Sequence, residues 1–199
     1  MRSRKNRGFT LLEFLIAMAI ALVLVSVATL SYIPIWKQHR VTNAYNSTLA
    51  TLRWAHDKAA ADMRTYVVTF TLPGTITVTQ APPANTLLVT TVLTSDVTFH
   101  VEPGVPASPN VPPTTPDGLG SAAFPIDFDE PGVGGGTVIY FYPDGTAEDV
   151  AGNINNGVVY LGRVGDLYSS RAITLWGSTG RIRGWRLNNV GGVATWGKQ

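Results

Sequence analysis

The first long pattern in the chain is an apolar stretch with a single charge in it. Residues 9–35 follow the basic segment MRSRKNRG and contain only apolar or uncharged side chains except for Glu13. A stretch of this length can cross a bilayer as a helix, and bases in front of it favour a cytoplasmic N-terminus. The pattern therefore predicts a membrane helix over residues 9–35.

The helical period continues beyond this stretch, but only on one face. Pro34 is expected to bend the helix because proline removes a backbone donor. Residues 36–64 then predict an amphipathic helix with one face to bury. The positions at spacings of three and four are Val41, Ala44, Tyr45, Thr48, Leu52, Ala55, Ala59 and Met63.

From residue 65 the apolar positions alternate with a period of two, which is typical of strands. Residues 65–199 are therefore expected to form an antiparallel β-sheet head, interrupted by a proline-rich surface loop at 103–120. The expected strands are residues 65–72, 75–80, 86–93, 96–102, 122–128, 137–142, 157–162, 171–176 and 180–187. The chain is thus predicted to be an α+β protein with a long, kinked N-terminal helix packed on this sheet.

Composition supports an extracytoplasmic, β-rich head and narrows the chemistry. Only 14% of the 199 residues are charged, and there is no cysteine, which excludes disulfides, thiolate metal sites and thiol nucleophiles. The charge is uneven: residues 66–162 hold nine acids and no lysine or arginine, and residues 163–199 hold six bases and one acid. An acidic middle therefore precedes a basic end.

Glu13 separates three interpretations of the N-terminus. A secretory signal with cleavage after Ser26-Val27-Ala28, or an uncleaved signal anchor, leaves a carboxylate in an apolar run unexplained. The segment RGFTLLEFLIAMAI resembles instead the prepilin leader of type IV pilins and type II secretion pseudopilins. There the leader ends at a glycine, here Gly8, the mature chain begins at a methylated phenylalanine, here Phe9, and the fifth mature residue is a glutamate, here Glu13.

That resemblance implies a role for the carboxylate. Cleavage after Gly8 by prepilin peptidase would create a cationic amine on Phe9, and Glu13 would pair with such an amine on its own helix or on a neighbouring subunit during assembly. The alternative is a protonated or snorkelling glutamate near the membrane interface.

The head is similar to a narrower group, the FimT and GspH minor pilins and pseudopilins. The similarity is seen in residues 52–70, 139–149 and 172–187, and the looser match of the head covers about half of residues 50–190. The proline-rich loop departs from it. In the FimT branch a Gly-Arg-x-Arg signature binds DNA during transformation, and the matching residues here are Gly180, Arg181 and Arg183.

The residues themselves leave two interpretations of the basic end open. On a strand, Arg181, Arg183 and Trp185 would share one face, with the guanidinium groups roughly 6–7 Å apart, a spacing that fits successive phosphates, and with Trp185 placed to stack on a base. Alternatively, the arginines pair with the acidic middle, and Trp176, Trp185 and Trp196 are packing residues.

The other candidate sites are weak, and neither an enzyme nor a metal or cofactor is expected. His39, His56 and His100 fit no zinc or triad spacing. The glycines of 132–136 predict a turn, since they lack the other residues of a phosphate loop. A calcium site was considered at Asp144, Glu148 and Asp149, although their spacing is not that of an EF-hand.

These patterns together predict a minor type IV pilin or pseudopilin. The expected partners are prepilin peptidase/methylase, the inner membrane and other pilin subunits, with double-stranded DNA as a further candidate. The chain would cross the inner membrane once and then reach the pilus, periplasm or cell surface. The alternatives are a DNA receptor at a pilus tip and a GspH-type subunit of type II secretion.

Overall fold

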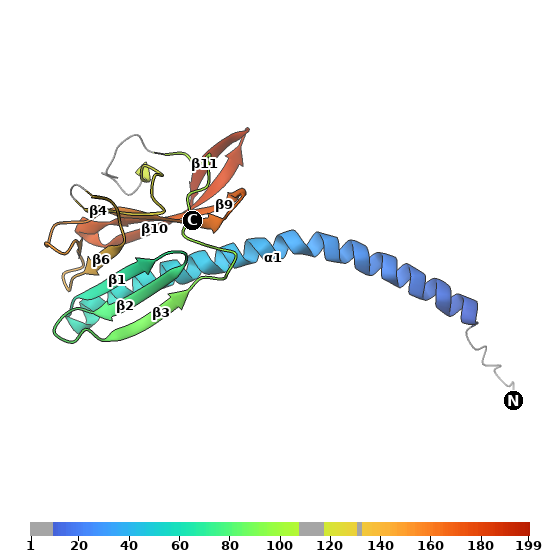
Figure 1. The fold of residues 1–199 in the computed structure, drawn as a ribbon, viewed down its shortest axis with the longest axis horizontal. Coiled ribbons are helices and arrows are strands. Elements are labelled where there is room, and N and C mark those ends of the chain that lie inside the picture. Colours follow the sequence, from blue (N-terminus) through green and yellow to red (C-terminus); the bar gives the residue numbers. More distant parts are fainter. Residues whose placement is uncertain (1–9, 108–117, 131–132) are drawn as a thin grey trace, which may run out of the picture. The chain divides into compact units, whose positions relative to one another are not determined.

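The computed structural model describes residues 10–107, 118–130 and 133–199, and its first element is one long helix. Helix α1 runs from Leu11 to Asp62 and continues through Pro34 (Figure 1). The chain divides within this helix into two units, one ending at His39 and one from Arg40 to Gln199. The predicted helix is confirmed, with ends at most two residues inside those expected, and the bend at Pro34 stays a prediction.

The second half of α1 buries the face that the sequence indicates. The seven expected positions from Val41 to Ala59 are all at most 4% exposed. Met63 is the exception, since it is 74% exposed. It follows the last helical residue and has a left-handed backbone, φ 52°, so the helical period no longer sets its direction.

The described part of the head contains two antiparallel sheets, where a single sheet was expected. The first has the strand order β3-β2-β1-β6-β7, and in Figure 1 strands β1, β2 and β3 lie beside the second half of α1. Its strands are β1 (Tyr66–Thr71), β2 (Thr75–Gln80), β3 (Leu87–Val92), β6 (Val138–Phe141) and β7 (Ala147–Glu148).

The second sheet carries the basic end of the chain and has the order β11-β10-β9-β8-β4-β5. Its strands are β4 (Ile126–Glu130), β5 (Val133–Gly136), β8 (Gly157–Arg163), β9 (Asp166–Trp176), β10 (Arg181–Val190) and β11 (Val193–Lys198). Every pair of neighbouring strands in both sheets is antiparallel, which confirms the α+β class.

One predicted strand was wrong, and three strands were missed. Residues 96–102 alternate, with Val97 and Phe99 buried, yet they form only an isolated bridge from Thr98 to Gly162. The glycines of 132–136, expected as a turn, mostly form β5, while β7 is only two residues long and β11 follows the Gly191-Gly192 turn. Alternating apolar positions show which side chains are buried. Whether a segment pairs as a strand depends on whether another strand lies beside it.

Both faces of the second sheet are covered. One face joins α1 and the first sheet in the main core, where Val68, Ile139 and Leu161 are 0% exposed. Burying such a side chain contributes roughly 1.5–3 kcal/mol. The other face carries a second cluster in which Tyr160 is buried and Trp185 and Trp196 are half-buried.

A close approach between α1 and β10 fixes how the helix meets the second sheet. A Cβ atom on Gly184 would collide with the Tyr45 hydroxyl and lie 2.6 Å from Tyr45 Cζ. Tyr45 is 4% exposed, so its ring has little room to move away. Glycine at 184 is therefore a packing requirement of the helix–sheet contact.

We predict that Gly184→Ala lowers the free energy of unfolding by about 1–3 kcal/mol through overpacking. The measurement is denaturant unfolding of the full chain in detergent, followed by tryptophan fluorescence. Tyr45→Ala supplies the control, because the double variant Tyr45→Ala/Gly184→Ala should be no less stable than Tyr45→Ala alone. Equal stability of Gly184→Ala and wild type would contradict the packing argument.

Candidate functional site

The N-terminal candidate residues lie at the start of α1, where the structure adds a helix cap. The backbone N–H of Glu13 donates to Thr10 Oγ1 at 3.2 Å, so Thr10 caps the helix. A threonine followed three residues later by a glutamate is the capping-box pattern, and a carboxylate in the first turn faces the positive end of the helix dipole. This Thr-x-x-Glu signal was overlooked in the sequence. Gly8 and Phe9 lie outside the described residues.

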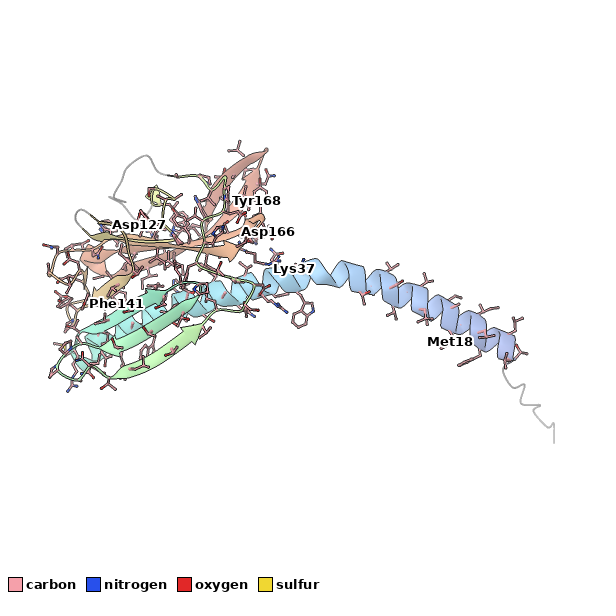
Figure 2. All side chains as sticks on the ribbon, in the orientation of Figure 1. Met18, Lys37, Asp127, Phe141, Asp166 and Tyr168 are labelled. Carbon is pink, nitrogen blue, oxygen red and sulfur yellow. The ribbon has the colours of Figure 1, made fainter. Side chains whose placement is uncertain are left out.

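The helix beyond this cap presents an apolar surface that the unit itself leaves uncovered. Leu11–Thr29 is long and apolar enough to cross a membrane, and none of it is buried within the structure. Leu11 is 79% exposed, and Figure 2 shows the labelled Met18 side chain projecting from the helix. A continuous apolar surface of this size requires lipid or other helices around it.

The second candidate surface is the outer face of β10. Its residues alternate as expected: Arg181, Arg183 and Trp185 are half-buried on one face, and Ile182 and Gly184 are buried on the other. The Arg181 guanidinium carbon lies 4.3 Å from the centre of the Trp176 ring, a cation–π contact. Trp176 is 39% exposed and was considered in the sequence only as a packing residue.

Trp185 is held by the fold. Its indole N–H donates to Thr174 Oγ1 at 3.0 Å, and its ring packs against the cluster that contains Tyr160 and Ala172. A tryptophan bonded and packed in this way stabilises the sheet, so the packing interpretation describes it better than base stacking does.

Gly180 has a structural reason to be glycine. Its backbone is left-handed, φ 58°, and a Cβ there would collide with the His56 ring and the Gly145 carbonyl. His56 itself donates from Nε2 to the Gly145 carbonyl at 3.2 Å and lies edge-on to Phe141, labelled in Figure 2. His56 is thus a packing residue that joins α1 to the turn after β6, and Gly180 lets β10 begin beside it.

Comparison with known proteins finds a sequence motif in the N-terminal segment. Residues 3–29 match the family model described as the prokaryotic N-terminal methylation motif. The chain carries a prokaryotic N-terminal methylation motif. No curated protein matches the sequence.

Two solved structures resemble about three quarters of the chain at low identity. The minor pseudopilin EpsH of the type 2 secretion system of Vibrio cholerae is 10% identical, with a TM-score of 0.47 over 74% of this chain and 97% of EpsH. The type IV minor pilin FimU of Pseudomonas aeruginosa is 12% identical, with a TM-score of 0.46 over 75% of this chain and 90% of FimU. Likenesses this distant do not carry a function from one chain to the other.

Arg163, at the end of β8, pairs with the acidic middle, whereas the second interpretation concerned the arginines of β10 and stays a prediction. Asp96 Oδ2 lies 3.4 Å from Arg40 Nη1 and 3.6 Å from Arg163 Nε, and Arg163 also reaches Asp166 at 3.6 Å. This carboxylate joins the helix, the segment after β3 and the end of β8. The pairing of Asp96 with two arginines was not foreseen in the sequence, because its partners are distant along the chain.

The remaining histidines lie in separate surroundings. His39 is exposed, and His100 Nε2 lies 3.0 Å from Glu102 Oε2. Among the described residues, no three His, Cys, Asp or Glu side chains come together as metal ligands.

The acidic loop considered for calcium is organised by its own hydrogen bonds. Asp149 is 3% exposed and accepts bonds from the amides of Ala151 and Asn153 and from the Asn153 side chain, all within 2.9 Å. These bonds, the Asn153 side chain first, hold the pKa of Asp149 below its usual range, although burial acts in the opposite direction. Both carboxylate oxygens are already engaged.

We predict that Asp149→Asn destabilises the chain at pH 7 and that this loss disappears in acid. A carboxylate with a depressed folded-state pKa contributes stability above its unfolded pKa, about 3.9, and loses it as the pH falls through the lower folded-state value. Thermal unfolding of both chains between pH 7 and pH 2.5 measures the difference. Asp57→Asn, an exposed change, is the control, and a pH-independent difference for Asp149→Asn would oppose the prediction.

Proposed function

We propose that this chain is a minor subunit of a type IV pilus or of a type II secretion pseudopilus. The carrying observation is that the methylation motif of residues 3–29 overlaps the apolar, unburied helix Leu11–Thr29. In this proposal, prepilin peptidase/methylase removes residues 1–8 and methylates Phe9. The subunit crosses the inner membrane once before it enters the filament. Its role is structural rather than enzymatic.

Assembly exchanges one apolar environment for another. The side chains of Leu11–Thr29 contact lipid before assembly and the helices of neighbouring subunits afterwards, so their surface stays out of water in both states. Glu13 is the charged residue that sets the axial position of the helix relative to the helix of a neighbouring subunit. Pairing with the amine of a neighbour's Phe9 offsets the cost of burying both groups.

The test is Glu13→Gln, which keeps the size of the side chain and removes its charge. We expect the variant to be processed, with a mature chain that begins at methylated Phe9 by mass spectrometry. We expect its incorporation into filaments to fall at least about tenfold, which corresponds to a loss of about 1.4 kcal/mol or more of pairing free energy between Glu13 and the Phe9 amine.

Thr10→Ser is the matched control, because serine also caps a helix and should leave incorporation unchanged. Wild-type incorporation of Glu13→Gln would contradict the charge-pairing role. A native chain that begins at Met1, or near Thr29, would contradict the proposed processing itself.

A second function is proposed for the outer face of β10, namely binding of double-stranded DNA at a filament tip. The observation in its favour is that Arg181 and Arg183 share one face of the strand, with Arg181 lying over Trp176. Gly180 starts the strand, and Trp185 supports the sheet from the same face. Contacts from arginine to backbone phosphates need no particular base sequence.

Charge reversal tests this second function. Arg181→Glu/Arg183→Glu should weaken DNA retention by the full chain at least about tenfold at low salt, and wild-type retention should fall steeply with salt. Arg53→Glu, on the exposed side of α1, is the control for a change in net charge and should reduce retention much less. Equal losses in both variants, or none in either, would remove β10 as the binding surface.

A further inference from the structure

Two arginines that the proposed functions do not use lie on neighbouring strands, on the face of the second sheet opposite Arg181 and Arg183. Arg186 of β10 is directly across from Arg171 of β9 in the antiparallel register. Gly184, two residues before Arg186 on the same face, is in contact with Tyr45 of α1. The pair therefore lies on the sheet face that meets the helix.

Arg171 is buried, and its recorded hydrogen bonds go to backbone carbonyls. The residue is 2% exposed, and its Nη1 donates to the carbonyls of Ser169 and Ser170 at 3.0 Å and of Tyr168 at 3.4 Å. Burial, followed by the neighbouring charge of Arg186, lowers the pKa of Arg171 to about 10. The guanidinium still carries its charge at neutral pH.

Arg186 leaves a donor unsatisfied at the same place. Its Nε atom is buried and makes no hydrogen bond within the part of the chain that the structure describes. Asp166 acts favourably on Arg171, but this carboxylate forms its recorded ion pair with Arg163. Tyr45 supplies no negative charge, because burial raises the pKa of its phenol.

This arrangement is unfavourable as it stands. Like charges directly opposite on neighbouring strands repel each other. A buried charge without a counter-charge also loses its hydration without recovering the energy through a partner. An anion between the two guanidinium groups would relieve both effects and would accept the hydrogen bond that Arg186 Nε does not make.

We propose that Arg171 and Arg186 form a binding site for a phosphate oxyanion, supplied as free phosphate or as a phospholipid headgroup. The guanidinium fork matches phosphate oxygens in geometry, and a phosphate group offers several acceptors and up to nearly two negative charges to the two cations. Arg171 forms the buried wall of the site and Arg186 its half-exposed entrance. The site is separate from Arg181 and Arg183, which point to the other face of the sheet.

The experiment measures the thermal midpoint of the full chain in non-ionic detergent, with sodium phosphate compared with sodium chloride at the same ionic strength. We expect 50 mM phosphate to raise the midpoint by about 3 °C or more for millimolar affinity. Arg186→Gln should abolish this rise. Arg64→Gln, an exposed change that removes the same charge just after α1, should keep it.

A second arm replaces free phosphate with micelles that contain phosphatidylglycerol. A rise with inorganic phosphate assigns the site to free phosphates, and a rise only with the lipid assigns it to headgroups. Either rise must be lost in Arg186→Gln and kept in Arg64→Gln. The proposal is overturned if neither probe raises the midpoint of the wild type, or if Arg186→Gln responds as the wild type does.

Discussion

The constraint on which the rest depends is that one helix must satisfy two different surroundings. Over Leu11–Thr29, α1 is apolar apart from Glu13 and a few small polar residues, and none of it is buried by the chain. From Val41 onward, the same helix presents a single apolar face, which two sheets cover. The first part therefore requires lipid or other helices, and the second part requires a head folded around it.

The Gly-Arg-Ile-Arg-Gly segment that begins at Gly180 combines two kinds of requirement. Gly180 and Gly184 are set by close contacts, the first with His56 and the Gly145 carbonyl and the second with Tyr45. Arg181 and Arg183 are not set in this way, since their side chains leave the opposite face of the strand. A substitution at either glycine would disturb the head as a whole, so only the arginines report on binding by this strand.

The elements with a strong period could be predicted from the sequence. The helix and most of the strands were predicted correctly, because burial of one face imposes a period of 3.6 or 2 on the apolar positions. The division into two sheets could not, since the partners of a strand depend on contacts far along the chain. Residues 96–102 illustrate this: Val97 and Phe99 are buried as a strand would bury them, yet the amide of Phe99 donates to the Pro73 carbonyl instead of to a neighbouring strand.

The candidate sites also divide into those that depend on residues close in sequence and those that depend on contacts far along the chain. The leader, Glu13 and the alternating face of β10 follow from residues close in sequence, and so does the cap at Thr10, although it was overlooked. Asp96 with Arg40 and Arg163, and Arg171 beside Arg186, depend on strand register and helix placement. Because β10 carries arginines on both faces, the net charge of the basic end describes two unlike environments. One is a half-buried surface next to Trp176, and the other is the face beside α1, where the Arg186 Nε atom is buried. The electrostatic properties of this strand therefore have to be assigned one face at a time.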